Sequence, residues 1–395
     1  MLQRNAIPAL LTGIMATLVG IGLSRFAYTP LIPTLIERDW FDSADAVYLG
    51  AANLLGYLIG ALSAHWLSER FAPRRVLASC FIIIALSFIC CASPASFSWF
   101  FGWRFLAGVA GAILLVVGSS LALTSAPAAS RALVGPLVFC GIGLGALLSA
   151  TVLPLLLELS LMWSWLTLGG LTIFAGIACD FGAARLRPEA FASGSAQPSS
   201  LRPVLGATTL LVMAAYALDA AGFVPHTVFW VDYLAREQGA GATAAAVQWA
   251  LFGAGAIIGP LLAGLLVKRL GWHRSLVLGY GAKATAIALP LFFASILSNS
   301  VSSFVVGAMV PGLVALTSGR LAELVGAANH KRVWGYATAG FAALQAISGY
   351  AMSGLYTVLG SYYLLFAIGS SLLAAGLVLI LLSRRVSNAP FAERT

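Results

Sequence analysis

Residues 6–36 read AIPALLTGIMATLVGIGLSRFAYTPLIPTLI, an apolar run that contains one charged side chain, Arg25. About 20 apolar residues suffice for an α-helix to cross the hydrocarbon core of a bilayer. Because lipid offers the backbone no hydrogen bonds, a span of this kind is predicted to be helical. The run is too long for the apolar region of a signal peptide, so we expect it to remain in the protein.

Similar apolar runs recur along the whole chain, separated by short clusters of Pro, Gly, Ser and charged residues. None shows the alternating polarity of membrane-barrel strands. Hydrophobic residues make up 60% of the chain and charged residues only 9%, whereas soluble domains carry roughly 25% charged residues. We therefore predict an all-α membrane protein with about twelve transmembrane helices, at residues 6–36, 44–67, 73–92, 97–124, 130–157, 161–184, 204–235, 243–268, 275–297, 301–324, 333–359 and 362–382.

The distribution of charge predicts the orientation of these spans. Arg25, Arg104 and Lys283 fall inside spans, and Arg38 and Arg236 lie on one side of the membrane. The other Lys and Arg residues lie at the N-terminus, in every second loop and at the C-terminus, and positively charged loops stay in the cytoplasm. Both termini are therefore predicted to be cytoplasmic. The opposite loops carry an acidic set: Glu37, Asp39, Asp42, Asp45, Glu158, Asp232 and Glu237.

A polar segment divides the chain into two groups of about six spans. Residues 187–203, RPEAFASGSAQPSSLRP, are rich in Ser, Ala and Pro, which is typical of a linker. The sequence ERFAPRR at 69–75 has an echo in KRLGWHR at 268–274. We therefore predict six-helix bundles at 1–186 and 204–395, the second with a short cytoplasmic tail, in the manner of transporters built from parallel repeats.

The repeated motif resembles the signature of the major facilitator superfamily, which reads roughly Gly-x-Leu-Ala-Asp-Arg-x-Gly-Arg-Arg between helices 2 and 3. Residues 65–74, HWLSERFAPR, keep its Leu and two of its Arg residues and replace Asp with Glu, and residues 264–274 form a second copy. The resemblance implies a gate at the cytoplasmic end, where contacts between the halves hold the outward-open state. The gate residues it implies are Glu69, Arg70, Arg74, Arg269 and Arg274.

Two further stretches carry the resemblance. Residues 104–112, RFLAGVAGA, fit the family's fourth helix, an Arg followed by spaced small residues. Residues 20–33, GIGLSRFAYTPLIP, resemble the signature of the bacterial YbfB/YjiJ-like branch, with Leu23 and Ser24 inserted before the Arg. The branch implies a multi-pass protein of the bacterial inner membrane and leaves the cargo open. We expect the protein to function as a monomer.

Arg25 is the first candidate for a substrate-binding residue. A charged residue at the centre of a span costs about 2.5–3.5 kcal/mol on insertion scales unless it has a partner or faces water. Helical spacing places Tyr28 and Thr29 on its face, while Pro30 and Pro33 loosen the backbone beyond. Contact with an anionic substrate group and an internal ion pair both explain such an Arg.

Asp219 in the seventh span lies at a similar depth, with Tyr216 and His226 on roughly the same face. It is predicted either to take up the coupling proton or to form a static bridge to Arg25. His226 is either a polar residue near the outer end of the span or a second proton-coupling group. Lys283 lies near the cytoplasmic end of its span, where its long side chain can reach the interface, so we leave it out of the site.

The remaining candidates are polar or amphipathic side chains that could complete a substrate pocket, and each is equally explained as a contact between helices. They are Asn53, Tyr57, Arg104, Gln248 and Trp249. No clustered basic face indicates a nucleic-acid partner. No metal site, cofactor motif or catalytic constellation stands out, so no enzyme activity is expected.

The sequence has no phosphate-binding loop of the Gly-x-x-x-x-Gly-Lys-Ser/Thr kind, so an ion gradient is the expected energy source. The leading hypothesis is a proton-coupled secondary transporter that moves a small organic anion by alternating access. A proton-driven efflux pump for drugs or metabolites is the alternative, and it would favour an aromatic, apolar cavity over paired charges. A membrane sensor or intramembrane enzyme without transport is a remote third.

Overall fold

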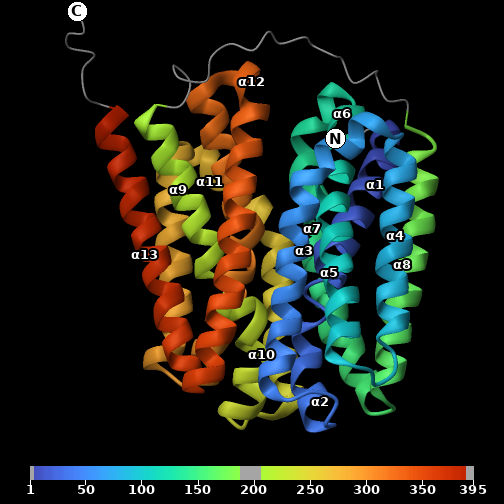
Figure 1. Ribbon diagram of the computed structural model, residues 1–395. Helices are drawn as coiled ribbons and strands as arrows, with labels where there is room; N and C mark the ends of the chain where they lie inside the picture. The colour runs from blue at the N-terminus through green and yellow to red at the C-terminus, as the bar shows by residue number, and fades with distance from the viewer. Residues whose placement is uncertain (1–3, 187–205, 388–395) are drawn as a thin grey trace, which may run out of the picture.

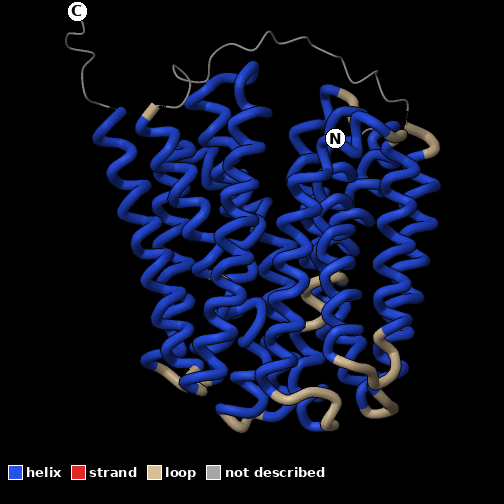
Figure 2. Tube along the Cα trace, in the orientation of Figure 1, coloured by secondary structure: helices blue, strands red, loops and turns tan. Residues whose placement is uncertain are grey.

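The computed structural model describes residues 4–186 and 206–387, so the linker predicted at 187–203 and the tail at 388–395 lie outside the described residues. All regular structure in the described part of the chain is helical, without a strand (Figure 2). Ten helices there are long and apolar enough to cross a membrane. The prediction of an all-α, multi-pass membrane protein is confirmed at this level.

Residues 4–186, which we call the first half, contain long helices joined by short turns. Side chains of Asp42, Ser96 and Ser160 cap three of them by accepting a hydrogen bond from the backbone three residues on. The helices are α1 (Ile7–Thr17), α2 (Ile32–Glu37), α3 (Ser43–Arg70), α4 (Pro73–Cys90), α5 (Phe97–Ile113), α6 (Ser119–Ser125), α7 (Ala128–Leu157) and α8 (Leu161–Ala183).

Residues 206–387, the second half, contain two very long helices with a sharp kink in each. Gly271 and Gly326 adopt φ of 78° and 74°, a backbone conformation that favours glycine, and each divides its helix into two arms. The spans predicted at 243–268 and 275–297 are therefore two arms of one helix. The elements are α9 (Ala207–Gly222), α10 (Trp230–Asp232), α11 (Gly241–Phe292), α12 (Ile296–Leu359) and α13 (Tyr362–Ser387).

The two halves lie side by side, with the helices from α1 to α8 on one side and those from α9 to α13 on the other (Figure 1). The start of α1 and the end of α13 lie at the same end of the molecule, and α2 and α10 lie at the opposite end (Figure 1). Contacts between the halves run along α3 with α12 and along α7 with α11. A Cβ on Gly143 of α7 would lie 2.4 Å from the Ile257 nitrogen of α11, so glycine allows this close approach.

The first span is broken, whereas the sequence predicts one helix over 6–36. After α1 the chain widens into a π-helix, η2 (Leu18–Leu23), forms turns at residues 24–28 and continues through a 3₁₀ turn, η3 (Thr29–Leu31), into α2. Helix packing explains the widening. A Cβ on Gly20 would lie 2.7 Å from the Gly111 carbonyl oxygen, and one on Gly22 would lie 2.8 Å from the Cα of Gly145.

The seventh span is broken in the same way. Helix α9 ends at Gly222, and a π-helix, η5 (Pro225–Phe229), leads into α10 and then into η6 (Tyr233–Glu237). The two breaks touch, because the Thr29 hydroxyl donates a hydrogen bond to the Thr227 carbonyl oxygen. Irregular backbone at membrane depth is tolerated where protein buries it or where it lines a cavity, so these breaks mark the region to search for a site.

Candidate functional site

Arg25 lies in the break of the first span and is 8% exposed. Its Nη1 donates to Oε1 of Gln345 on α12, at 2.9 Å, which joins the two halves. The guanidinium carbon lies 5.7 Å from the centre of the Phe26 ring and 5.9 Å from that of Tyr57. Arg25 Nη2 and Gln345 Nε2 are buried and have no hydrogen-bond partner.

Arg104 on α5 is a second buried cation, 1% exposed. Its Nη1 donates to the Ser24 carbonyl oxygen at 2.7 Å, and its guanidinium carbon lies 4.3 Å from the centre of the Tyr28 ring. Among residues 4–186 and 206–387, no ion pair joins Arg25 or Arg104 to a carboxylate. Unpaired buried cations are unfavourable, so this region attracts an anion.

A small cavity lies between the two arginines, with room for little more than a water molecule. Tyr28 and Thr29 line it together with Arg25, so the structure brings these three residues to one place, as the spacing predicts. The Tyr28 hydroxyl donates to the Ala46 carbonyl oxygen at 2.8 Å, and the Tyr28 ring covers Arg104.

Asp219 does not bridge to Arg25, which corrects one of the two readings of the sequence. Its Oδ1 lies 2.6 Å from Nζ of Lys283, and both side chains are fully buried. Lys283 therefore does not reach the interface as expected, because a buried carboxylate on α9 faces it from across the second half. Its Nζ also lies 4.2 Å from the centre of the Phe223 ring.

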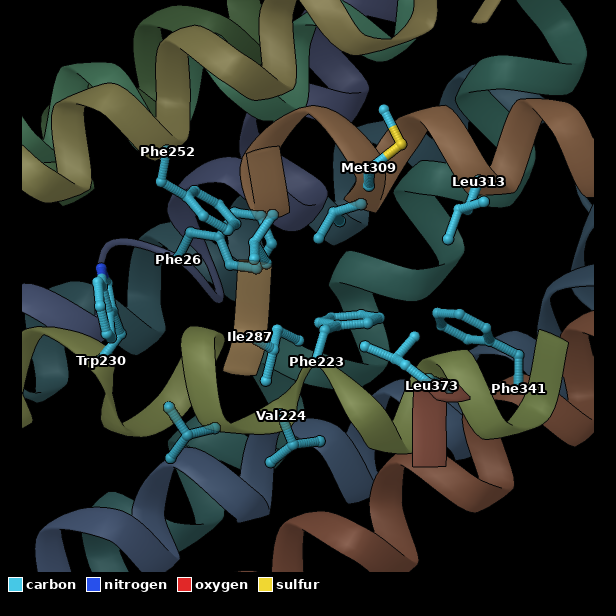
Figure 3. Close-up of a cluster of buried hydrophobic side chains, with 14 of the residues drawn as sticks. Phe26, Phe223, Val224, Trp230, Phe252, Ile287, Met309, Leu313, Phe341 and Leu373 are labelled. Atoms are coloured by element: carbon cyan, nitrogen blue, oxygen red, sulfur yellow. The ribbon is translucent and has the colours of Figure 1, made fainter. Parts of the chain in front are cut away.

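Aromatic side chains fill the space around this ion pair. The Tyr216 ring, one turn before Asp219, lies 4.5 Å from Phe341 and 5.3 Å from Trp334 by ring centres. The rings of Phe223 and Phe341 are 6.0 Å apart, and Figure 3 shows them reaching toward each other from different helices. Phe341 and Gln345 are four residues apart on one arm of α12, so they lie on the same face.

Two other candidates make contacts between helices. Asn53 donates to the carbonyl oxygens of Ser24 and Arg104, at 3.4 and 3.3 Å, so it stabilises the break of the first span. Gln248 donates to the Ser300 hydroxyl at 3.1 Å and accepts from Ser303 at 3.3 Å, both within the second half.

Trp249 and His226 are also held by neighbouring helices. Trp249 Nε1 donates to the Ser149 hydroxyl at 3.2 Å, which joins α11 to α7 across the halves. His226 is fully buried, with Nε2 2.7 Å from the Ser302 hydroxyl and its ring 4.4 Å from that of Trp230. Of the pocket candidates, Tyr57 lies with its ring centre 5.9 Å from the Arg25 guanidinium carbon, and Tyr28, Thr29 and Arg104 line the cavity beside Arg25.

The predicted gate residues make contacts within the first half or face outward. Glu69 pairs with His65 at 3.2 Å, Arg74 pairs with Asp180 at 2.5 Å, and Arg70 lies over the Trp66 ring. The second-half pair, Arg269 and Arg274, is exposed. No ion pair among the described residues joins the halves through these side chains, so the expected gate contacts are not formed in this conformation.

Polar contacts between the halves occur at the opposite end, near α2 and α10, in a group that we call the cross-half cluster. Asp232, expected in an outer loop, is fully buried there and binds Arg236 through both oxygens, at 2.5 and 2.6 Å. Arg236 Nη2 also donates to the Ser43 hydroxyl of α3 at 3.1 Å. The hydroxyls of Tyr356 and Tyr362 complete the hydrogen-bond network. The cluster consists of Ser43, Asp232, Arg236, Tyr356 and Tyr362.

Comparison with known sequences identifies the family of this chain. The profile of a family described as "Uncharacterised MFS-type transporter YbfB" matches residues 17–381. The chain is 28% identical over 393 residues to the 3-(3-hydroxy-phenyl)propionate transporter of Escherichia coli, which covers 89% of this chain and 88% of that protein.

Two shorter matches come from Acinetobacter baylyi. The benzoate transport protein is 28% identical over 155 residues, covering 37% of this chain and 33% of that protein. The niacin transporter NiaP is 28% identical over 122 residues, covering 31% of this chain and 28% of that protein. The resemblance carried by residues 20–33 and 104–112 is confirmed by the profile, which spans both stretches. This chain belongs to the YbfB-like family of major facilitator transporters.

Proposed function

We propose that this protein is a secondary active transporter that moves a small organic anion across the bacterial inner membrane by alternating access. The observation that carries the proposal is the pair of buried cations, Arg25 and Arg104, with no carboxylate bound to either among the described residues. An anion from solution supplies the missing charge. The names of the relatives support this cargo class, since hydroxyphenylpropionate, niacin and benzoate transporters all carry carboxylic acids.

The proposed architecture has twelve spans in two pseudo-symmetric bundles at 1–186 and 204–395, joined by a linker at 187–203. Ten candidate spans become twelve when α11 counts as two arms and the arm of α12 after Gly326 is added. The matching breaks in the first and seventh spans support the pseudo-symmetry. Both termini are proposed to be cytoplasmic, in line with the distribution of Lys and Arg.

The proposed conformation is closed toward the outside. With cytoplasmic termini, the cross-half cluster lies at the outer end, where Arg236 and Ser43 connect the halves. The arginines of the proposed cytoplasmic gate would join the halves only after the cluster has separated. The two sets of contacts would then alternate, which is the simplest way for one site to face each side in turn.

Asp219 is the proposed proton-coupling residue. It is a buried carboxylate with one oxygen, Oδ2, that has no partner, and its other oxygen holds Lys283. Protonation would remove the charge that Lys283 needs, so it would loosen the contact between α9 and the second arm of α11. His226 is the second candidate, because its Nδ1 is buried without a partner.

Uptake into proteoliposomes tests the proposal. Wild-type protein should accumulate labelled benzoate when a pH gradient is imposed and should only equilibrate it without one. Arg25→Ala should abolish uptake while the purified variant keeps its elution volume and helical content. Arg25→Lys should rescue poorly, because a lysine lacks the planar two-pronged donor geometry that suits carboxylates. Undiminished uptake by Arg25→Ala would refute the assignment of the site.

A further inference from the structure

Two unused hydrogen-bond donors meet at the contact between the halves. Arg25 donates through Nη1 to Oε1 of Gln345, which leaves Arg25 Nη2 and Gln345 Nε2 without hydrogen-bond partners. Gln345 is fully buried. A buried donor without an acceptor is destabilising, so a ligand that accepts from both donors would remove two such penalties at once. A carboxylate has two oxygens with the required acceptor capacity.

Aromatic side chains lie beside both donors. Phe26 and Tyr57 lie beside the Arg25 guanidinium, and Phe341 lies one turn before Gln345 on α12. Phe341 in turn packs on Tyr216. A ligand with further hydroxyl or amino groups would bury them against rings that offer few hydrogen bonds, which is unfavourable. A planar ring would gain from edge or offset stacking in the same place.

We propose that Gln345 is the second-half ligand of the substrate and that the substrate class is the aromatic monocarboxylates. The carboxylate accepts from Arg25 Nη2 in the first half and from Gln345 Nε2 in the second, and the ring packs against Tyr57 and Phe341. This inference rests on the proposed transport of an organic anion and adds the residue and the substrate class.

The two donors belong to different halves, so a ligand bound to both would link the halves. Arg25 belongs to the first half and Gln345 to the second, so a carboxylate shared between them holds both halves to one ligand. A ligand bound by Arg25 alone would favour neither relative position of the halves. Binding through both donors favours the conformations in which the halves are close at this depth, which couples occupancy to closure.

Ligand binding to the purified full-length chain in lipid nanodiscs separates the elements of the proposal. The probes are benzoate, benzamide as the uncharged ring, and acetate as the carboxylate without a ring. Gln345→Leu removes the donor at similar volume, and Gln345→Glu places a carboxylate beside Arg25. Ser353→Ala is the matched control, because Ser353 is buried two turns further along α12 and bonds only its own helix, at the Gly349 carbonyl oxygen.

Wild type should bind benzoate at least roughly tenfold more tightly than benzamide, since a hydrogen bond to a charged group is worth that factor. It should also bind benzoate more tightly than acetate, because acetate lacks the ring that packs against Tyr57 and Phe341. Gln345→Leu should weaken benzoate binding by about tenfold or more while Ser353→Ala leaves it unchanged. Gln345→Glu should fold, because its carboxylate pairs with Arg25, and should lose benzoate binding by competition.

Wild-type affinity in Gln345→Leu together with lost binding in Arg25→Ala would overturn the role of Gln345 and leave the proposed function standing. Acetate bound as tightly as benzoate would overturn the aromatic class alone. If Gln345→Leu elutes as an aggregate, Gln345→Glu decides, and benzoate bound by that variant as by wild type overturns the proposal. Benzoate binding that survives in Arg25→Ala would instead refute the assignment of the substrate site to Arg25, on which both this inference and the proposed function rest.

Discussion

Asp219 and Lys283 form an ion pair of 2.6 Å between two fully buried side chains, from α9 and the second arm of α11. Each charge in such a pair compensates the other, because a single buried ion without a partner is strongly unfavourable. The pair lies among Tyr216, Phe223 and Phe341 rather than beside Arg25. Arg25 and Asp219, which the sequence suggested as possible partners, therefore lie in separate environments.

Removing one member of this pair should destabilise the protein, and removing both should restore part of the loss. Asp219→Asn or Lys283→Met alone should lower the free energy of unfolding by about 3–5 kcal/mol, because the remaining charge is buried without its partner. The double variant should melt at a higher temperature than either Asp219→Asn or Lys283→Met. Thermal unfolding of the three variants in detergent measures this, and additive losses would contradict the pairing.

The same double variant addresses coupling. If Asp219 carries the transported proton, Asp219→Asn with Lys283→Met should exchange labelled benzoate across the membrane while failing to concentrate it under a pH gradient. Wild type should do both. Benzoate counterflow and pH-driven uptake in the same proteoliposomes separate the two activities, and pH-driven accumulation by the double variant would exclude Asp219 as the coupling residue.

The cross-half cluster should keep one end of the protein closed. Asp232→Asn weakens both bonds to Arg236, and so frees the side chain that reaches Ser43 of α3. In a background without the five native cysteines, Thr29→Cys should then react faster with a membrane-impermeant maleimide added from outside. Ser298→Ala is the control, because its hydroxyl bonds only local carbonyl oxygens. Equal labelling rates with and without Asp232→Asn would count against the cluster as a gate.

A substitution at Arg70 should change the labelling of Thr29→Cys in the opposite direction to Asp232→Asn. Neither the Arg70 nor the Arg74 side chain joins the halves in this conformation, and the Arg74 ion pair with Asp180 is about half exposed on both sides. Arg70→Glu should therefore change the free energy of unfolding by no more than about 0.5 kcal/mol, as for most surface substitutions. It should nevertheless disfavour the outward-open state, which reduces labelling of Thr29→Cys from outside. A large loss of stability would mean that Arg70 has contacts beyond the Trp66 ring.

Packing between α7 and α11 can be tested with one substitution at two glycines. Gly143→Ala would place a Cβ 2.4 Å from the Ile257 nitrogen, so the helices must move apart and the melting temperature should fall. Gly264→Ala has nothing within 4 Å of the new Cβ and gains up to about 1 kcal/mol of helix propensity. Melting curves of the two variants should therefore shift in opposite directions. Similar shifts would indicate that the close approach at Gly143 does not limit stability.

Much of the fold follows from the sequence because the membrane imposes local rules. Apolar runs of sufficient length must be helical, and the helices found at residues 43–70 and 161–183 begin and end close to the predicted spans 44–67 and 161–184. The first span was predicted as one helix over 6–36, with its backbone loosened only at Pro30 and Pro33, but the helix is interrupted by turns at residues 24–28. Just before these turns, Gly20 and Gly22 lie against α5 and α7, a close contact that hydropathy does not record.

The sequence by itself determined the membrane class and the family and singled out Arg25 as a charge within a span, because hydropathy, family signatures and a lone charge in an apolar run are all local properties. Only the tertiary structure decided the partners. Gln345 meets Arg25 across 320 positions of sequence, and Lys283 meets Asp219 across 64. Which polar groups come together inside a helical membrane protein depends on how helices distant in sequence pack, and on the rule that a buried charge must find compensation wherever the packing offers it.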